Sequence, residues 1–149
     1  MVDEAAFKRV ANTAYPLPCP FGQALLAGCC ACSRVTRHQI AEREALVCTL
    51  ATAHQACTEL HGLLRQNSQF AIRDIRDAAP ITHAQHLKIQ CGGLQGVQLE
   101  VDGSPLVADV YALVEAARQK FGTADQFPYE HIVRAVAAYR ARKRNHEST

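Results

Sequence analysis

Four of the seven cysteines of this chain stand close together, in the segment CPFGQALLAGCCACSR that runs from residue 19 to residue 34. Prolines flank Cys19 on both sides, and because proline fixes φ and removes a backbone donor, we predict an extended loop there. The following GQALLAG is predicted to form one helical turn that Gly28 closes, after which CCACSR returns to loop. Three thiols in four residues of loop gain little from packing, so the segment indicates a metal centre.

The compartment predicted from the sequence keeps these thiols reduced. The number of cysteines is odd and the chain starts without a secretory signal, and both facts argue against a disulfide framework. There is no run of about 18 apolar residues, so no membrane span is expected. We therefore expect a cytoplasmic protein in which clustered thiols serve as ligands or catalysts.

Length and composition predict a mainly α protein of one domain. Of its 149 residues 48% are hydrophobic and 20% charged, which is ordinary for a globular chain. The expected architecture is a single-domain helical bundle with a cysteine-rich N-terminal loop and a short β hairpin or extended element. Within the domain, 1–149, we distinguish a cysteine-rich loop segment (1–35), a helical body (36–144) and a flexible tail (145–149).

The spacing of the cysteines predicts an iron–sulfur cluster ahead of a zinc site. Cys29 and Cys32 have the x2 spacing that lets two thiolates reach one metal ion or two irons of one cluster. Cys19 is the best third ligand, because it lies in a proline-stiffened loop and a proline follows it directly. Cys48 is the best fourth, in the helix predicted to leave the loop, and Cys30 offers a substitute for Cys29.

The remaining cysteines and the histidines leave other ligands open. Cys57 lies among leucines and Cys91 just before two glycines, so each is either a small core residue or a further ligand. All seven cysteines therefore stand as candidate metal ligands: Cys19, Cys29, Cys30, Cys32, Cys48, Cys57 and Cys91. His54 and His61 flank Cys57 on one predicted helix face and form a rival site, although they fit surface positions better. His83 and His86 are a second pair with i, i+3 spacing, also expected at the surface.

The predicted function is that of a small metal-binding protein rather than a stand-alone enzyme. A cluster, of the [4Fe–4S] type, would serve electron transfer, redox sensing or the assembly of another metal centre, with a redox or metalloprotein partner. The first alternative is a structural zinc site in an interaction module. The second is a thiol-redox protein in which Cys29 and Cys32 form the reactive pair. Nucleic acid is not expected as a partner, because the net charge is only +2 and no aromatic residues alternate with the basic ones.

In the first half of the helical body we predict a helix from Thr36 to Asn67, either continuous or broken near TLAT. Thr36 would cap it, and Leu60, Leu63 and Leu64 are core candidates in its second part. Arginines and aspartates dominate residues 73–77, which are predicted to form a solvated surface.

In the second half we predict a short helix that Thr82 caps and that ends at the glycine pair 92–93. The alternation in VQLEVDG then predicts a strand or hairpin arm over 97–101. A helix capped by Ser104 and closed by Gly122 follows, and Pro128 opens the last one. The basic residues 140–144 at its end are expected to project into solvent, where they could meet an acidic partner.

Overall fold

The computed structural model describes residues 17–40, 43–72 and 80–140, and in these ranges the chain is mainly helical with a two-stranded antiparallel hairpin. The predicted fold class is thereby confirmed. In chain order the elements are α2 (Gly22–Ala27), β1 (Val35–Ile40), β2 (Arg43–Cys48), α3 (Ala51–Asn67), α4 (Gln69–Ile72), α5 (His83–Leu87), the π-helical turn η1 (Lys88–Gly92), α6 (Gly93–Asp102), α7 (Val110–Phe121), the 3₁₀ turn η2 (Ala124–Gln126) and α8 (Tyr129–Ala138). No helix in the described ranges is long and apolar enough to cross a membrane.

The hairpin β1–β2 occupies the first half of the helix predicted from Thr36, so that prediction was wrong. Val35 pairs with Cys48 at the open end of the hairpin. The hydroxyl of Thr36 hydrogen-bonds the ring of His38, 2.9 Å away, instead of capping a helix. An ion pair of 3.0 Å between Arg37 and Glu44 joins the strands. Cross-strand pairing and burial of the end of β2 outweigh a helical pattern that was only weakly periodic.

Helix α3 confirms the second part of the same prediction. It begins at Ala51, directly after the sequence TL, and ends at Asn67. Leu60 and Leu64 on its inner face are fully buried, as predicted, and Ala56 and Cys57 continue the same stripe toward the hairpin. Leu63, the third predicted core residue, is only partly buried and packs against the core. The apolar period of 3.6 residues was therefore a reliable signal where the whole stripe meets the core.

The segment from α5 to α6 is helical throughout, although the sequence predicted a stop at residues 92–93 and a strand over 97–101. Thr82 does cap α5, in a capping box with Gln85. The helix then continues through η1 because the glycines let it approach α8 closely. A Cβ atom at Gly92 would lie 2.8 Å from Cα of Val136. These glycines allow close packing and do not end the helix.

Helix α7 begins at Val110, so the prediction that Ser104 caps it was wrong. Asp109 is the N-cap, and its side chain accepts a hydrogen bond of 3.1 Å from the backbone N–H of Tyr111. Gly122 ends α7 as predicted, with a φ of 105°. Pro128 precedes α8 as predicted. Of the basic residues 140–144 only Arg140 lies in the described ranges, where it is exposed, and the charged stretch 73–77 lies outside them.

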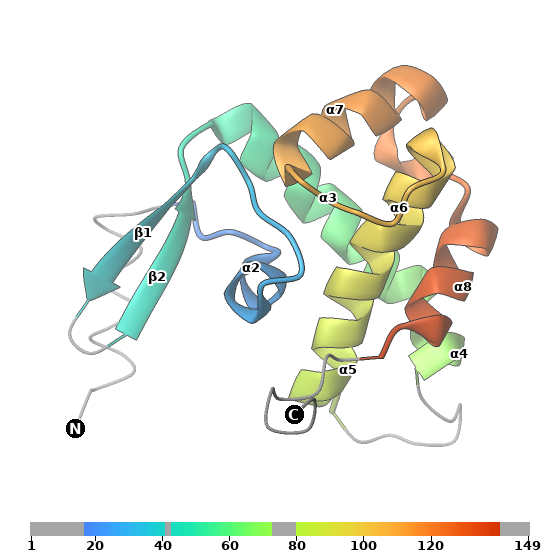
Figure 1. Cartoon of the computed structure of the whole chain (residues 1–149), viewed down its shortest axis with the longest axis horizontal. Helices are drawn as coiled ribbons and strands as arrows, with labels where there is room; N and C mark the ends of the chain where they lie inside the picture. The colour runs from blue at the N-terminus through green and yellow to red at the C-terminus, as the bar shows by residue number, and fades with distance from the viewer. Residues whose placement is uncertain (1–16, 41–42, 73–79, 141–149) are drawn as a thin grey trace, which may run out of the picture.

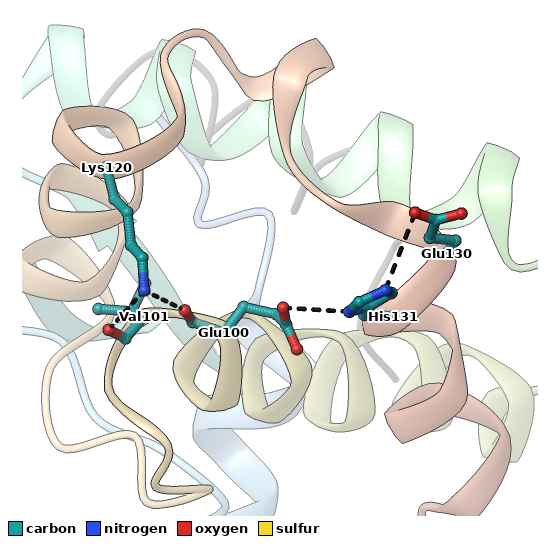
Figure 2. A network of polar contacts seen from close by, with 5 residues as sticks. All are labelled: Glu100, Val101, Lys120, Glu130 and His131. Atoms are coloured by element: carbon teal, nitrogen blue, oxygen red, sulfur yellow. Dashed lines mark hydrogen bonds and ion pairs between the residues drawn. The ribbon is translucent and has the colours of Figure 1, made fainter.

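The core forms where α6 runs between α3, α7 and α8, and the hairpin lies at one end of the molecule with α2 between it and the helices (Figure 1). Fully buried side chains of this core include Leu60, Leu64, Ile89, Leu94, Val97 and Ile132. Polar contacts at the outer end of α6 join this helix to α7 and to α8, as Figure 2 shows. Lys120 of α7 donates to the carbonyl oxygens of Glu100 and Val101 at 2.7 and 3.2 Å, and His131 of α8 lies 3.4 Å from the Glu100 carboxylate.

Candidate functional site

The cysteines predicted as ligands fall on four separate segments that meet beside the core. Cys19 precedes α2, Cys30 and Cys32 lie in the loop after it, Cys48 ends β2 and Cys57 lies on α3. All five are free thiols. Cys48 thus belongs to a strand and not to the predicted helix.

Backbone pairing places Cys19 next to Cys48. Pro18 forms an antiparallel bridge with Val47, which adds the segment before α2 to the edge of β2. The N–H of Cys19 donates to the carbonyl of Leu46 at 2.9 Å, and the N–H of Cys48 donates to the carbonyl of Leu17 at 2.8 Å. The proline-rich loop therefore extends the hairpin edge, which accounts for its extended conformation.

Hydrogen bonds on two sides hold the loop that carries Cys32. On one side the N–H of Val35, whose partner across the hairpin is Cys48, lies 3.4 Å from the carbonyl of Cys32. On the other side the loop docks on the N-terminus of α7. There Asp109 accepts the N–H of Ser33 at 2.9 Å, and the N–H of Val110 donates to the carbonyl of Ala31 at 2.8 Å. Cys32 is thus fixed between the hairpin and α7.

The first turns of α3 bring Cys57 to the same place. His54 lies one turn before it on the same helix face, and its ring Nε2 is 3.0 Å from the carbonyl oxygen of Pro18, directly before Cys19. Cys57 is 8% exposed, so its thiol points inward beneath that segment. The Cys48 thiol donates to the carbonyl of Leu50 at 3.3 Å, just before α3 begins.

Four of these thiols, Cys19, Cys32, Cys48 and Cys57, are mutual neighbours, and we refer to them as the thiol cluster. Burial raises the pKa of the Cys57 thiol to about 12, with smaller contributions from the other three thiols. Burial also raises the pKa of Cys19 to about 11, with contributions from Cys32 and Cys48. Burial is again the main cause of the raised pKa of Cys32, to which Cys48 adds. Each member therefore lies close enough to the other three to interact electrostatically.

Backbone donors point at the sulfurs of two members of the cluster. The N–H of Phe21 hydrogen-bonds the sulfur of Cys19 and opposes the rise of its pKa. The backbone of Arg34 and that of Tyr111, in the first turn of α7, do the same for Cys32. The guanidinium of Arg34 stacks 4.5 Å from the centre of the Tyr111 ring, which keeps a positive charge close by. Such donors stabilise a thiolate and tune the potential of a bound metal centre.

Cys30 is a fifth thiol at the edge of the cluster. Burial raises its pKa to about 12, and Cys19 and Cys32 contribute to the rise. It faces two members of the cluster, whereas each member faces three. Its predicted role, as a substitute for Cys29 in binding metal, stays a prediction.

Cys29 lies outside the cluster because it is bonded to Cys91. The two form a disulfide across 62 positions of sequence, with a Cα–Cα distance of 6.2 Å. This bond was not expected from the odd number of cysteines. A sulfur in a disulfide cannot act as a thiolate ligand while the bond is intact. The thiol cluster thus contains Cys57 where the predicted ligand set had Cys29.

The spacing of the side chains bears on what the cluster can hold. Across residues 17–40, 43–72 and 80–140, no three histidine, cysteine, aspartate or glutamate side chains are placed to share a single metal ion. A tetrahedral zinc ion with Zn–S bonds of about 2.3 Å needs sulfurs only about 3.8 Å apart. In a four-iron cluster each thiolate binds a different iron, so the four sulfurs stand farther apart.

The histidines do not extend the cluster. His54 is engaged with Pro18, as described, and the ring of His61 packs edge-on against the buried Phe21, with 5.6 Å between ring centres. Burial lowers the pKa of His61, with a contribution from His86, and among the residues that the structure describes its Nε2 has no hydrogen-bond partner. His61 and His86 border a groove of about 400 Å³ that also reaches Cys19. The two histidines of the predicted rival site, His54 and His61, therefore contact different residues.

Comparisons of the chain with protein-family models, with curated proteins and with solved structures find no match.

Proposed function

We propose that this protein holds a [4Fe–4S] cluster through the thiolates of Cys19, Cys32, Cys48 and Cys57, and that the cluster serves electron transfer. One observation carries the proposal: four free thiols from four segments converge so that each neighbours the other three. Free cysteine is often buried as a small core residue, so the proposal depends on the number of separate segments that bring a free thiol to the same place. Four thiolates are the usual ligand set of such a cluster.

One further feature supports an iron–sulfur cluster over zinc. The N–H groups directed at the sulfurs of Cys19 and Cys32 are the kind of donor that sets the potential of a cluster. A structural zinc site on the same four sulfurs remains the alternative, and it requires the sulfurs to close in.

Electron transfer is favoured over a purely structural role because two of the proposed ligands, Cys19 and Cys32, are only partly buried. Cys19 borders the groove that His61 and His86 also line. A redox partner seated there would come close to one ligand sulfur while the other side of the cluster stays against the core. The partner would be a redox protein or a metalloprotein in the cytoplasm, and redox sensing or metal-centre assembly would use the same ligands.

The test is to purify the protein without oxygen and to measure its visible spectrum together with iron, sulfide and zinc. We expect broad absorption near about 400 nm with iron and sulfide in equal amounts. The decisive variants are Cys57→Ser and Cys29→Ser. The first should lose most of the iron because it removes a ligand, whereas the second removes only the disulfide and should keep it.

The outcomes separate the alternatives. If Cys29→Ser loses the iron and Cys57→Ser keeps it, the ligand set predicted from spacing is the correct one. One zinc per chain without colour identifies the zinc module. A protein without metal, iron or zinc, contradicts the proposal. Circular dichroism of each variant distinguishes loss of a ligand from loss of the fold.

A further inference from the structure

The disulfide between Cys29 and Cys91 joins two sulfurs in very different surroundings. Cys91 is fully buried in the π-helical turn η1, in contact with the core. Cys29 is only partly buried, in the loop directly after α2. A reagent arriving from solvent therefore meets the sulfur of Cys29 first.

Cys29 borders a groove at the surface. It has a volume of about 390 Å³ and lies between the loop after α2, helices α5 and α6, and the segment after α8. Cys29, Leu87, Pro105, Leu106 and Arg140 are among the residues that border it. Leu106 is 76% exposed, so the groove has an apolar wall at the surface. Its one described cation, Arg140, favours a ligand with a negative charge.

The position of Cys91 is also unusual. π-helical turns are rare and occur mostly at functional sites, because they cost regular hydrogen bonding. Here the turn places Cys91 so that the disulfide ties η1 to the loop that carries Cys30 and Cys32. A purely structural staple between two helices would not need an open groove beside one of its sulfurs.

We propose that Cys29–Cys91 is a redox-active disulfide, and that it exchanges with a small anionic thiol that enters this groove and attacks Cys29. The site lies outside the thiol cluster and does not depend on a metal being bound there. It also differs from the CxxC pair considered from the sequence, since the partner of Cys29 is Cys91 and not Cys32.

The exchange proceeds in two steps that balance. In the first, the thiolate of the small thiol attacks the Cys29 sulfur, a mixed disulfide forms, and the Cys29–Cys91 bond breaks. The Cys91 sulfur leaves and takes up a proton, because a thiolate is unfavourable at a fully buried position. In the second, another molecule of thiol attacks the mixed disulfide and frees Cys29. Two thiols are oxidised to their disulfide, and the protein gains two electrons and two protons.

Reduced glutathione, added to the native wild-type protein without oxygen, provides the test. In the first turnovers, before glutathione disulfide accumulates, the five free thiols have no disulfide of glutathione to react with, so glutathione that becomes attached must come from attack on the existing bond. After acid quenching we expect fragmentation mass spectrometry to find one glutathione, on Cys29. With longer reaction the free thiols should rise from five to seven.

Groove variants add a second readout. Leu106→Trp should slow the attachment of glutathione because it narrows the entrance. Leu26→Trp is the matched control, since Leu26 is an exposed leucine at the other groove, beside Cys19, and its rate should equal that of the wild type.

Three results would overturn the proposal. The first is glutathione on Cys91 instead of Cys29. The second is no reaction in the native protein when the urea-unfolded protein reacts readily, which identifies a structural bond. The third is seven free thiols at the start, which means that the bond does not form.

Discussion

Replacing Gly96 by alanine tests the close approach of α6 to α8 on which the core depends. A Cβ atom at this position would lie 2.8 Å from the carbonyl oxygen of Ile132 and 3.1 Å from Cβ of Ala135. Because the nearest atom belongs to the backbone, the helices must move apart, and overpacking of this kind costs about 1–3 kcal/mol. Alanine recovers about 1 kcal/mol of helix propensity. We therefore expect Gly96→Ala to lower the free energy of unfolding by up to about 2 kcal/mol.

Gly62 in α3 provides the matched control. It is exposed, and a Cβ atom there would meet nothing within 4 Å. Gly62→Ala gains the same propensity without overpacking, so it should raise the free energy of unfolding by up to about 1 kcal/mol. Urea unfolding at one fixed redox state, with an unchanged m-value, measures both variants. If Gly96→Ala stabilises the protein as much as Gly62→Ala does, the result contradicts the close approach of α6 to α8 at Gly96.

Two further predictions concern the site and its support. Since Cys19, Cys32 and Cys57 all have raised pKa values, each carries a proton at neutral pH and must release it on binding metal. The amount of cluster formed when the metal-free protein is reconstituted with iron and sulfide should thus rise between pH 6 and 8, and an amount independent of pH contradicts thiolate ligation. Asp109→Ala should destabilise the protein by about 1–2 kcal/mol through loss of the α7 cap, while Asp109→Asn should keep most of the stability. Equal loss in both variants, seen in urea midpoints, would show that the capping role is wrong.

The helices that the sequence predicted well are those whose boundaries depend on local chemistry. Thr82 caps α5, Gly122 ends α7 and Pro128 opens α8, and in each case the residue acts on its own turn. The failures occurred where a distant partner decides the structure. Residues 36–48 became a hairpin because the two strands pair with each other, and the glycines near residue 92 continue a helix because α8 lies against them.

The same distinction applies to the thiols. The density of the loop cysteines pointed to them as candidate ligands, whereas Cys57 was assigned mainly to the core. Whether Cys57 lies near the loop cysteines depends on where α3 begins. Only with the hairpin in place does α3 start at Ala51 and direct Cys57 toward Cys19. The bond between Cys29 and Cys91 joins residues 62 positions apart, and no local pattern indicates which cysteine would reach the other. The sequence signal for the position of Cys57 was its i, i+3 spacing from His54, which places both side chains on one face of α3.

The order of the cysteines along the chain has a consequence for the newly made protein. All four members of the thiol cluster lie between residues 19 and 57, whereas Cys91 comes 34 positions after the last of them. A ribosome adding about 5–20 residues per second exposes the complete cluster about 2–7 s before Cys91. During this interval Cys29 has no partner and is one more free thiol beside the others. Under the proposed function, metal delivered to the nascent chain would meet a different set of sulfurs from metal delivered after release, and the moment of delivery would select the ligands.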